Sequence, residues 1–108
     1  MNCDPALDWA KNFSLAHLRQ KMRDHLHEAA DAYGSGHLVE FDQNFRMFYL
    51  AASAIHLKCQ GPDTGKVHGQ IFTFLNKWES AFRIKFFTHA FSEEFINLCE
   101  ISSSLIYG

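Results

Sequence analysis

Seven histidines in 108 residues are the side chains best suited to chemistry in this sequence, either as metal ligands or as acid–base groups. The closest pair is His25 and His27, but side chains two residues apart diverge by about 200° on a helix and cannot share an ion. Zinc sites on helices use His at i and i+4 or the HExxH motif, and neither spacing occurs here. We therefore expect no metal and no cofactor. A solvated polar helix face accounts for His17, Asp24, His27, Glu28 and Asp31.

A second candidate for chemistry is the segment from Arg83 to His89, which holds a cation and an imidazole close together in the chain. Its spacing resembles the Arg-x(4–6)-His motif of the HEPN ribonucleases, small four-helix proteins that act on RNA across a dimer. The resemblance covers this segment and the all-α size, while Ile84 stands where that family commonly has a polar residue. It implies that His89 is an acid or base and that Arg83 stabilises phosphate charge.

The run His56-Leu57-Lys58 is similar to the His-x-x-Lys-Gly motif of histidine phosphotransfer domains, which are also helical bundles. A phosphorelay needs an exposed His with a Lys nearby to neutralise the phosphoryl group. Here Lys58 is one residue closer than in that motif, and Cys59 replaces the glycine. Pro62 also ends the helix early. We therefore predict that His56 is a partly buried structural histidine at the edge of the core.

The composition is that of a folded protein in a reducing compartment. A hydrophobic content of 47% with 20% charged residues argues against disorder, and the net charge of −2 argues against a broad basic surface for nucleic acid. Cys3, Cys59 and Cys99 are odd in number and lack CxxC spacing, so we expect free thiols. The sequence shows no signal-peptide pattern and no apolar run of the ~20 residues that cross a membrane. These features predict a cytoplasmic protein without membrane contact.

The element that must position these groups is a long helix predicted from His37 to Cys59, which carries apolar side chains on two faces. A helix that is apolar on two faces must be covered on both, so we expect it to lie centrally in a bundle or in an oligomer contact. The first stripe spans about 80° of arc and contains Phe41, Phe45, Phe48, Ala52, Ile55 and Cys59. The second stripe contains Val39, Met47, Leu50, Ala54 and Leu57.

An earlier helix is expected to precede this one. Asp4-Pro5 has the pattern of a helix start, and Ser14 is expected to cap a second helical piece after a break. Gly34 is expected to end this piece in the left-handed conformation. The segment from Gln60 to Gly65, rich in Gly and Pro, is expected to be a loop.

Two later helices complete an all-α bundle of four main helices in a single domain spanning residues 1–108. One is predicted over about Lys66–Ala90, and Ser92 is expected to cap the last. Their expected core faces are Val67, Ile71, Phe74, Leu75, Trp78, Phe82 and Phe86, and then Phe95, Leu98, Cys99, Ser102, Leu105 and Ile106.

These patterns predict a helical interaction or regulatory protein without catalytic activity that acts as a homodimer. Two alternatives stay open: the ribonuclease that uses Arg83 and His89, and a small-ligand site inside the bundle lined by Phe and Trp with His as polar anchors. The expected dimer interface contains Val39, Met47, Leu50, Leu57, Ile84, Phe87 and Phe91.

Overall fold

The computed structural model describes residues 13–59, 62–84 and 89–107, with side chains for 13–59, 62–81 and 92–107. Within these ranges the chain forms four α-helices and no strands, which confirms the predicted all-α fold class. None of these helices is both long enough and apolar enough to cross a membrane. The helices are α2 (Leu15–Gly34), α3 (Leu38–Lys58), α4 (Pro62–Ile84) and α5 (His89–Tyr107).

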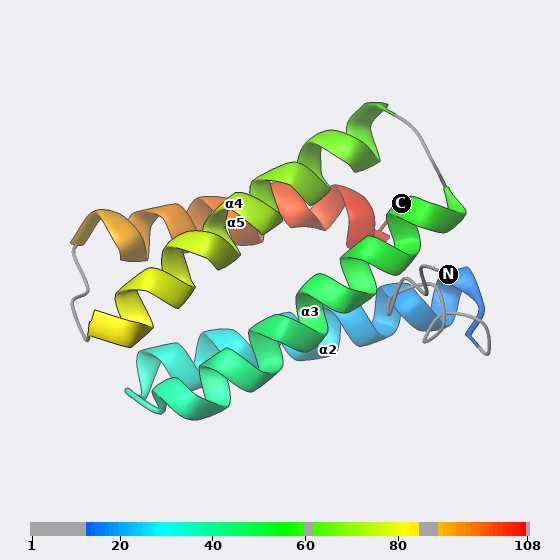
Figure 1. Ribbon diagram of the computed structural model, residues 1–108. Coiled ribbons are helices and arrows are strands. Elements are labelled where there is room, and N and C mark those ends of the chain that lie inside the picture. The colour runs from blue at the N-terminus through cyan, green and yellow to red at the C-terminus, as the bar shows by residue number, and fades with distance from the viewer. Residues whose placement is uncertain (1–12, 60–61, 85–88, 108) are drawn as a thin grey trace, which may run out of the picture.

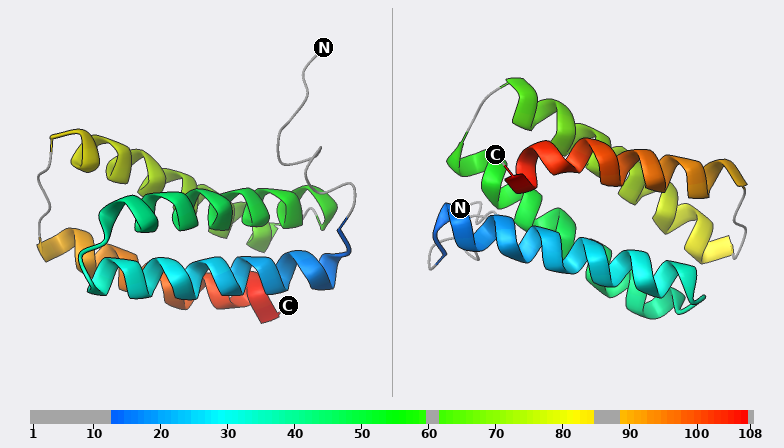
Figure 2. Two further views of the ribbon diagram at one scale, coloured as in Figure 1. Left: turned by 90° about the horizontal axis from the view of Figure 1, so that it is seen from below. Right: turned by 180° about the vertical axis from the view of Figure 1, so that it is seen from behind.

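The four helices pack as a closed ring in two layers. In Figure 1, α3 and α4 form the layer nearer the viewer, and α2 and α5 lie behind them. The views from below and behind in Figure 2 show the same two layers. Each helix packs mainly on two neighbours, because α2 contacts α3 and α5 while α4 contacts the same pair. This arrangement buries one face of every helix.

The ring of Phe41 on α3 contacts aromatic rings on each of the other three helices. Phe41 of α3 is fully buried, and its centroid lies 4.5 Å from that of Trp78 on α4. The Phe41 centroid also lies 5.3 Å from Tyr33 of α2 and 5.2 Å from Phe95 of α5. Phe45, one turn along α3, stacks on it at 5.5 Å. Such ring pairs add to the free energy gained by burying their area.

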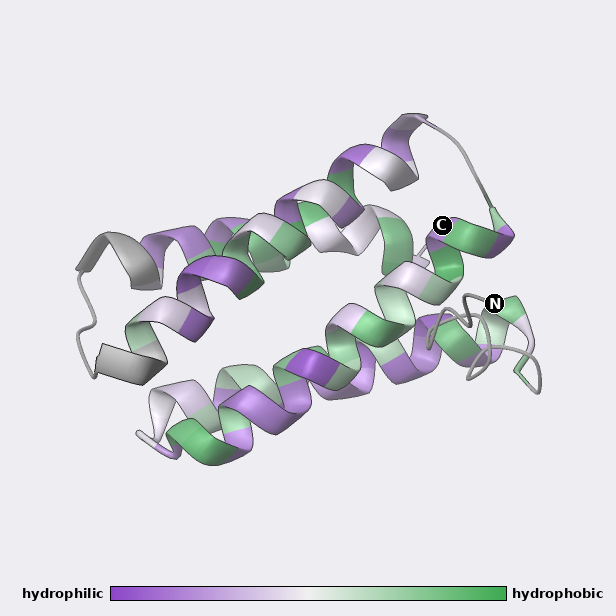
Figure 3. Cartoon of the chain, viewed as in Figure 1, coloured by the Kyte–Doolittle hydropathy of each residue, from purple (hydrophilic) through white to green (hydrophobic). Residues whose placement is uncertain are grey.

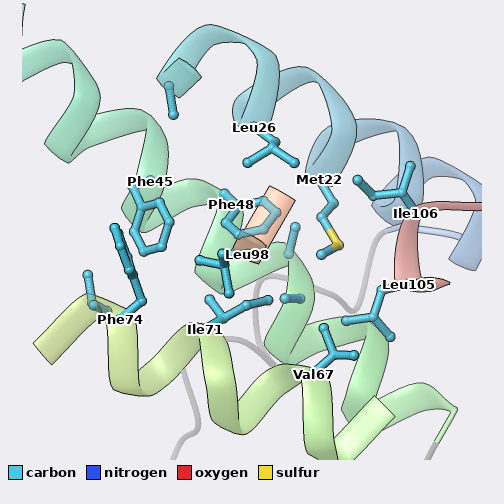
Figure 4. Packing of buried hydrophobic residues seen from close by; sticks show 14 of the residues in the cluster. Met22, Leu26, Phe45, Phe48, Val67, Ile71, Phe74, Leu98, Leu105 and Ile106 are labelled. Carbon is cyan, nitrogen blue, oxygen red and sulfur yellow. The ribbon is translucent and has the colours of Figure 1, made fainter. Parts of the chain in front are cut away.

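Aliphatic side chains fill the remainder of the core. Figure 4 shows Met22 and Leu26 of α2 facing Phe48 of α3 and Ile71 of α4, with Leu98 of α5 completing the layer. The predicted core face of α4 is confirmed from Val67 to Trp78, while the positions of Phe82 and Phe86 lie outside the described side chains. On α5 the predicted inner face is buried except for Cys99, which is half-buried.

The two apolar stripes of α3 have different surroundings. The first is buried from Phe41 to Ile55, whereas Cys59 at its end is half-buried. In the second stripe, Ala54 is fully buried and Val39 is 61% exposed. Met47, Leu50 and Leu57 are half-buried, and Figure 3 shows hydrophobic bands near both ends of α3 with hydrophilic residues between them. Within one chain this face is therefore only partly covered.

Both ends of α2 are set by identifiable capping contacts. The hydroxyl of Ser14 accepts a hydrogen bond of 3.2 Å from the amide of His17, which confirms the predicted cap. The expected left-handed Gly34 is wrong, because Gly34 is the last helical residue and Gly36 has the positive φ of 76°. The amide of His37 donates to the carbonyl of Ala32 at 2.8 Å, as in a Schellman motif with glycine at C′.

Three further boundaries differ from those predicted. Pro62 begins α4, so Asp63 to Gly65 are helical rather than loop, because proline at N1 lacks only an amide that would be unpaired there anyway. The predicted single helix over Lys66–Ala90 is wrong, since α4 ends at Ile84 and α5 begins at His89. Ser92 lies inside α5 and does not cap it; its hydroxyl instead contacts that of Tyr33 at 2.8 Å. The predicted helical piece starting at Asp4 lies outside the described residues.

We expect the substitution Phe41→Ala to lower the free energy of unfolding by about 3–5 kcal/mol, because it leaves a cavity where four helices meet. Urea unfolding followed by circular dichroism measures this change. Ile96→Ala is the matched control: Ile96 is 58% exposed, so the expected loss is about 0.5 kcal/mol or less. Equal losses for the two variants would contradict this account of the core.

Candidate functional site

A row of polar side chains follows the edge of α3 that faces α4. Asp42, Arg46, Tyr49, Ser53 and His56 recur at alternating intervals of four and three residues, which places them on one side of a helix. Of these five, only His56 was singled out from the sequence, although the spacing itself indicates a helix edge. Together with their α4 partners Thr64, His68, Trp78 and Glu79 we term them the α3–α4 seam.

One end of the seam is a charged network built around a buried indole. Trp78 is fully buried, and its Nε1 donates a hydrogen bond of 2.7 Å to Asp42 Oδ1. Arg46 Nε donates to both carboxylate oxygens of Asp42 at 3.1 Å, and its Nη1 lies 3.1 Å from Glu79 Oε1. The hydrogen bond to Asp42 raises the pKa of Arg46 above its usual value, and Glu79 adds to the effect. The network fixes the register of α4 against α3.

The other end of the seam is a stack of rings tied by two hydroxyl contacts. Ser53 Oγ lies 2.8 Å from His68 Nε2, and His56 Nδ1 lies 2.9 Å from Thr64 Oγ1. The His68 ring stacks between Tyr49 and His56, with centroid distances of 5.3 and 5.4 Å. His56 is half-buried, as predicted, and its structural role stays a prediction.

The pairing of Ser53 with His68 matches the first step of a nucleophilic site, in which an imidazole activates a hydroxyl. Burial argues against that use here. Ser53 is only 9% exposed and lies within the continuous helix α3, where its hydroxyl faces α4. The contact instead satisfies two polar groups at a helix interface.

The sequence-predicted residues lie on several elements of the fold. Arg83 lies in the last turn of α4 and His89 begins α5, so the two occupy different helices and not the one helix expected. Their side chains lie outside the described residues, and the catalytic role stays a prediction. His25 is half-buried and its Nδ1 lies 3.2 Å from Asn44 Oδ1. The polar face predicted on α2 is exposed at His17, Asp24, His27, Glu28 and Asp31.

Open grooves exist at the surface between helices. One of them has a volume of about 610 Å³ and lies between α4 and α5. Phe74 and Leu98 line its floor, while an ion pair of 3.1 Å between Lys77 and Glu94 lies at its rim. Among the described side chains no group of three or more His, Cys, Asp or Glu residues is placed to hold a metal ion.

Comparison with known proteins adds no further constraint on the site. No family model matches the chain, and neither a curated protein nor a solved structure matches it. The functional argument therefore depends on the contacts and exposed surfaces of this chain.

We expect Asp42→Ala to lower the free energy of unfolding by about 2 kcal/mol, because the buried N–H of Trp78 loses its acceptor. Asp42→Asn keeps an acceptor oxygen and should recover part of this loss. Glu79→Ala removes only a half-exposed partner of Arg46 and should cost less than about 1 kcal/mol. Thermal unfolding of the three variants measures these values. A larger loss for Glu79→Ala than for Asp42→Ala would show that the indole contact is not the dominant one.

Cys99 is expected to resist alkylation in the folded protein. Burial raises the pKa of its thiol from 9.0 to about 11, with a smaller contribution from the charge of Glu100. At pH 8 this shift lowers the thiolate fraction about a hundred-fold relative to the unfolded chain. Iodoacetamide labelling with and without urea, read by mass spectrometry of the Cys99 peptide, checks the rate.

The same shift fixes the sign of the pH dependence. Because the folded state holds the proton more tightly, the contribution of Cys99 to stability is complete below pH 9 and is lost as the pH rises towards 11. A Cys99→Ala variant, which has no thiol to titrate, should lose less stability over this pH range than the native chain.

Proposed function

We propose that this protein is a cytoplasmic helical interaction protein without catalytic activity, and that it pairs with a second copy of itself through the outer face of α3. The observation that carries the proposal is the exposure of Val39, at 61%. The half-buried Met47, Leu50 and Leu57 share that face of the helix. The two described cysteines, Cys59 and Cys99, are free thiols, which suits a reducing compartment.

Neighbouring α4 extends this apolar surface. Phe72 is 48% exposed, and its ring centroid lies 6.0 Å from that of Tyr49 on α3. Burial of apolar area gains about 25 cal/mol per Å², so covering these side chains favours association. Ile84, Phe87 and Phe91, whose side chains lie outside the described residues, stay predicted members of the same interface.

The positions of the four α3 side chains suit a two-fold contact. Val39 and Leu57 lie nine residues to either side of Phe48, while Met47 lies one residue before it and Leu50 two residues after it. If two copies of α3 crossed antiparallel about this point, each Val39 would lie opposite the partner's Leu57, and each Met47 would lie one residue away from the position opposite the partner's Leu50. A two-fold interface requires this kind of self-complementary pairing.

Light scattering coupled to size-exclusion chromatography tests the proposal. We expect a mass twice the 12.4 kDa of one chain. Val39→Lys should raise the dissociation constant of the dimer by about 10-fold or more. Each of the two chains then loses a buried apolar side chain from the interface and gains a charge there. A monomer at every concentration up to the high micromolar range would rule out the proposal.

Ile96→Lys is the matched control for this experiment. Ile96 is 58% exposed, nearly as much as Val39, but it lies on α5. The same charge placed there should leave the dimer mass unchanged. Equal dissociation by both variants would show that added charge, and not the α3 face, controls association.

A further inference from the structure

Arg19 of α2 is a half-buried cation that has no visible counter-charge. The Nε atom of Arg19 is buried and has no hydrogen-bond partner. Within the described part of the chain no carboxylate lies within ion-pair distance of its guanidinium, whereas the neighbouring Arg23 lies 3.7 Å from Asp24. A guanidinium carries five N–H donors, and a buried donor left unpaired is unfavourable. The buried Nε therefore lacks an acceptor, and the terminal Nη atoms are the donors of Arg19 that a ligand can reach.

Arg19 lines a pocket of about 280 Å³ where the N-terminus of α4 meets α3 and the end of α5. Ile55 and Leu105 give this pocket an apolar wall, and both are almost fully buried. The hydroxyls of Thr64 and Ser104 also line it, but each already has a partner: His56 Nδ1 at 2.9 Å for Thr64, and the Ile101 carbonyl at 3.0 Å for Ser104. Cys59 adds a free thiol, which is only a weak donor. The guanidinium is therefore the strongest donor that remains to bind an anion.

One carboxylate also lines the pocket. Asp63 is exposed and lies in the first turn of α4, where the positive end of the helix dipole, worth about half a unit charge, stabilises a carboxylate. Asp63 forms no ion pair with Arg19. The guanidinium beside the apolar wall therefore has no charge partner among the described residues.

From this geometry we infer that the pocket binds a small organic anion, with its carboxylate or phosphate group on Arg19 and its apolar part against Ile55 and Leu105. The planar guanidinium can donate two parallel hydrogen bonds to either oxyanion. The site is separate from the outer face of α3 through which we propose self-association. Its occupation does not depend on that proposal.

Thermal unfolding of the full chain with phosphate, acetate or butyrate tests this inference, with sodium chloride at equal ionic strength as reference. At ten times its dissociation constant, a bound anion should raise Tm by about 5 °C. Phosphate also stabilises proteins by exclusion from their surface, so the measured quantity is the difference between native chain and variant. A gain with phosphate alone identifies a phosphate group, and a gain with acetate and butyrate identifies a carboxylate.

Arg19→Met and Arg23→Met form a matched pair, one helical turn apart and equal in charge. Arg19→Met should abolish the anion-dependent gain, and without anion it should unfold at the same temperature as the native chain or higher, because an unpaired buried charge is removed. Arg23→Met should keep the gain. Should Arg19→Met prove insoluble, Arg19→Lys keeps the charge but loses bidentate binding, and is expected to reduce the gain.

Three results would overturn the inference. The first is a native chain that responds to none of the anions beyond chloride. The second is an equal loss of response in the Arg23→Met variant, which would indicate unspecific surface charge. The third is strong destabilisation by Arg19→Met without anion, since this would show that Arg19 stabilises the end of α5 and binds no ligand.

Discussion

The hydrogen bond from the buried indole of Trp78 to Asp42 constrains how the two front helices can lie. An indole N–H that is removed from water must find an acceptor, and the acceptor on α3 lies 2.7 Å away. Arg46, on the same helix as Asp42, donates hydrogen bonds to the Asp42 carboxylate. The carboxylate is therefore positioned by both Arg46 and Trp78. A slip of α4 by one residue would break this contact and would also move Phe41 out of its place against the Trp78 ring.

The same principle operates at each edge of the four-helix ring. Apolar burial supplies most of the stabilisation but is not directional, so it leaves the relative register of two helices weakly defined. Hydrogen bonds and ion pairs between side chains are directional, so they fix the relative register of two helices at interfaces where most contacts are apolar. The ties are His25–Asn44 between α2 and α3, Trp78–Asp42 between α3 and α4, Lys77–Glu94 between α4 and α5, and Tyr33–Ser92 between α5 and α2.

Periodicity in the sequence predicts those parts of the structure that depend on burial alone. The apolar stripe of α3 from Phe41 to Ile55 and the core face of α4 from Val67 to Trp78 are confirmed, because one buried face every 3.6 residues leaves a clear pattern. The helix ends were predicted less accurately from the sequence. Gly36 and not Gly34 takes the left-handed conformation, and Ser92 bonds Tyr33 from a distant helix where local chemistry suggested a cap. Contacts between residues far apart in the chain decide such positions, and local spacing does not encode them.

In the candidate sites, too, local spacing predicts some features, while contacts between distant residues decide the others. The polar residues of the α3–α4 seam have a regular spacing that is visible in the sequence, although their partners on α4 are not. Arg19 precedes His25 by the same spacing as Arg83 precedes His89, but this spacing gives no sign of burial. It becomes noticeable only in the tertiary fold, where its Nε atom is buried without an acceptor and the residue lines a pocket with the end of α5 and the start of α4.

The Schellman turn at Gly36 has a consequence for the order in which the chain acquires structure. Only Ser35 to His37 separate α2 from α3, so these two helices form a tight antiparallel hairpin from residues close in sequence. Closing so short a connection costs little chain entropy, and contacts of low sequence separation form fastest during folding. We expect the hairpin to offer a nucleus on which α4 and α5 can dock.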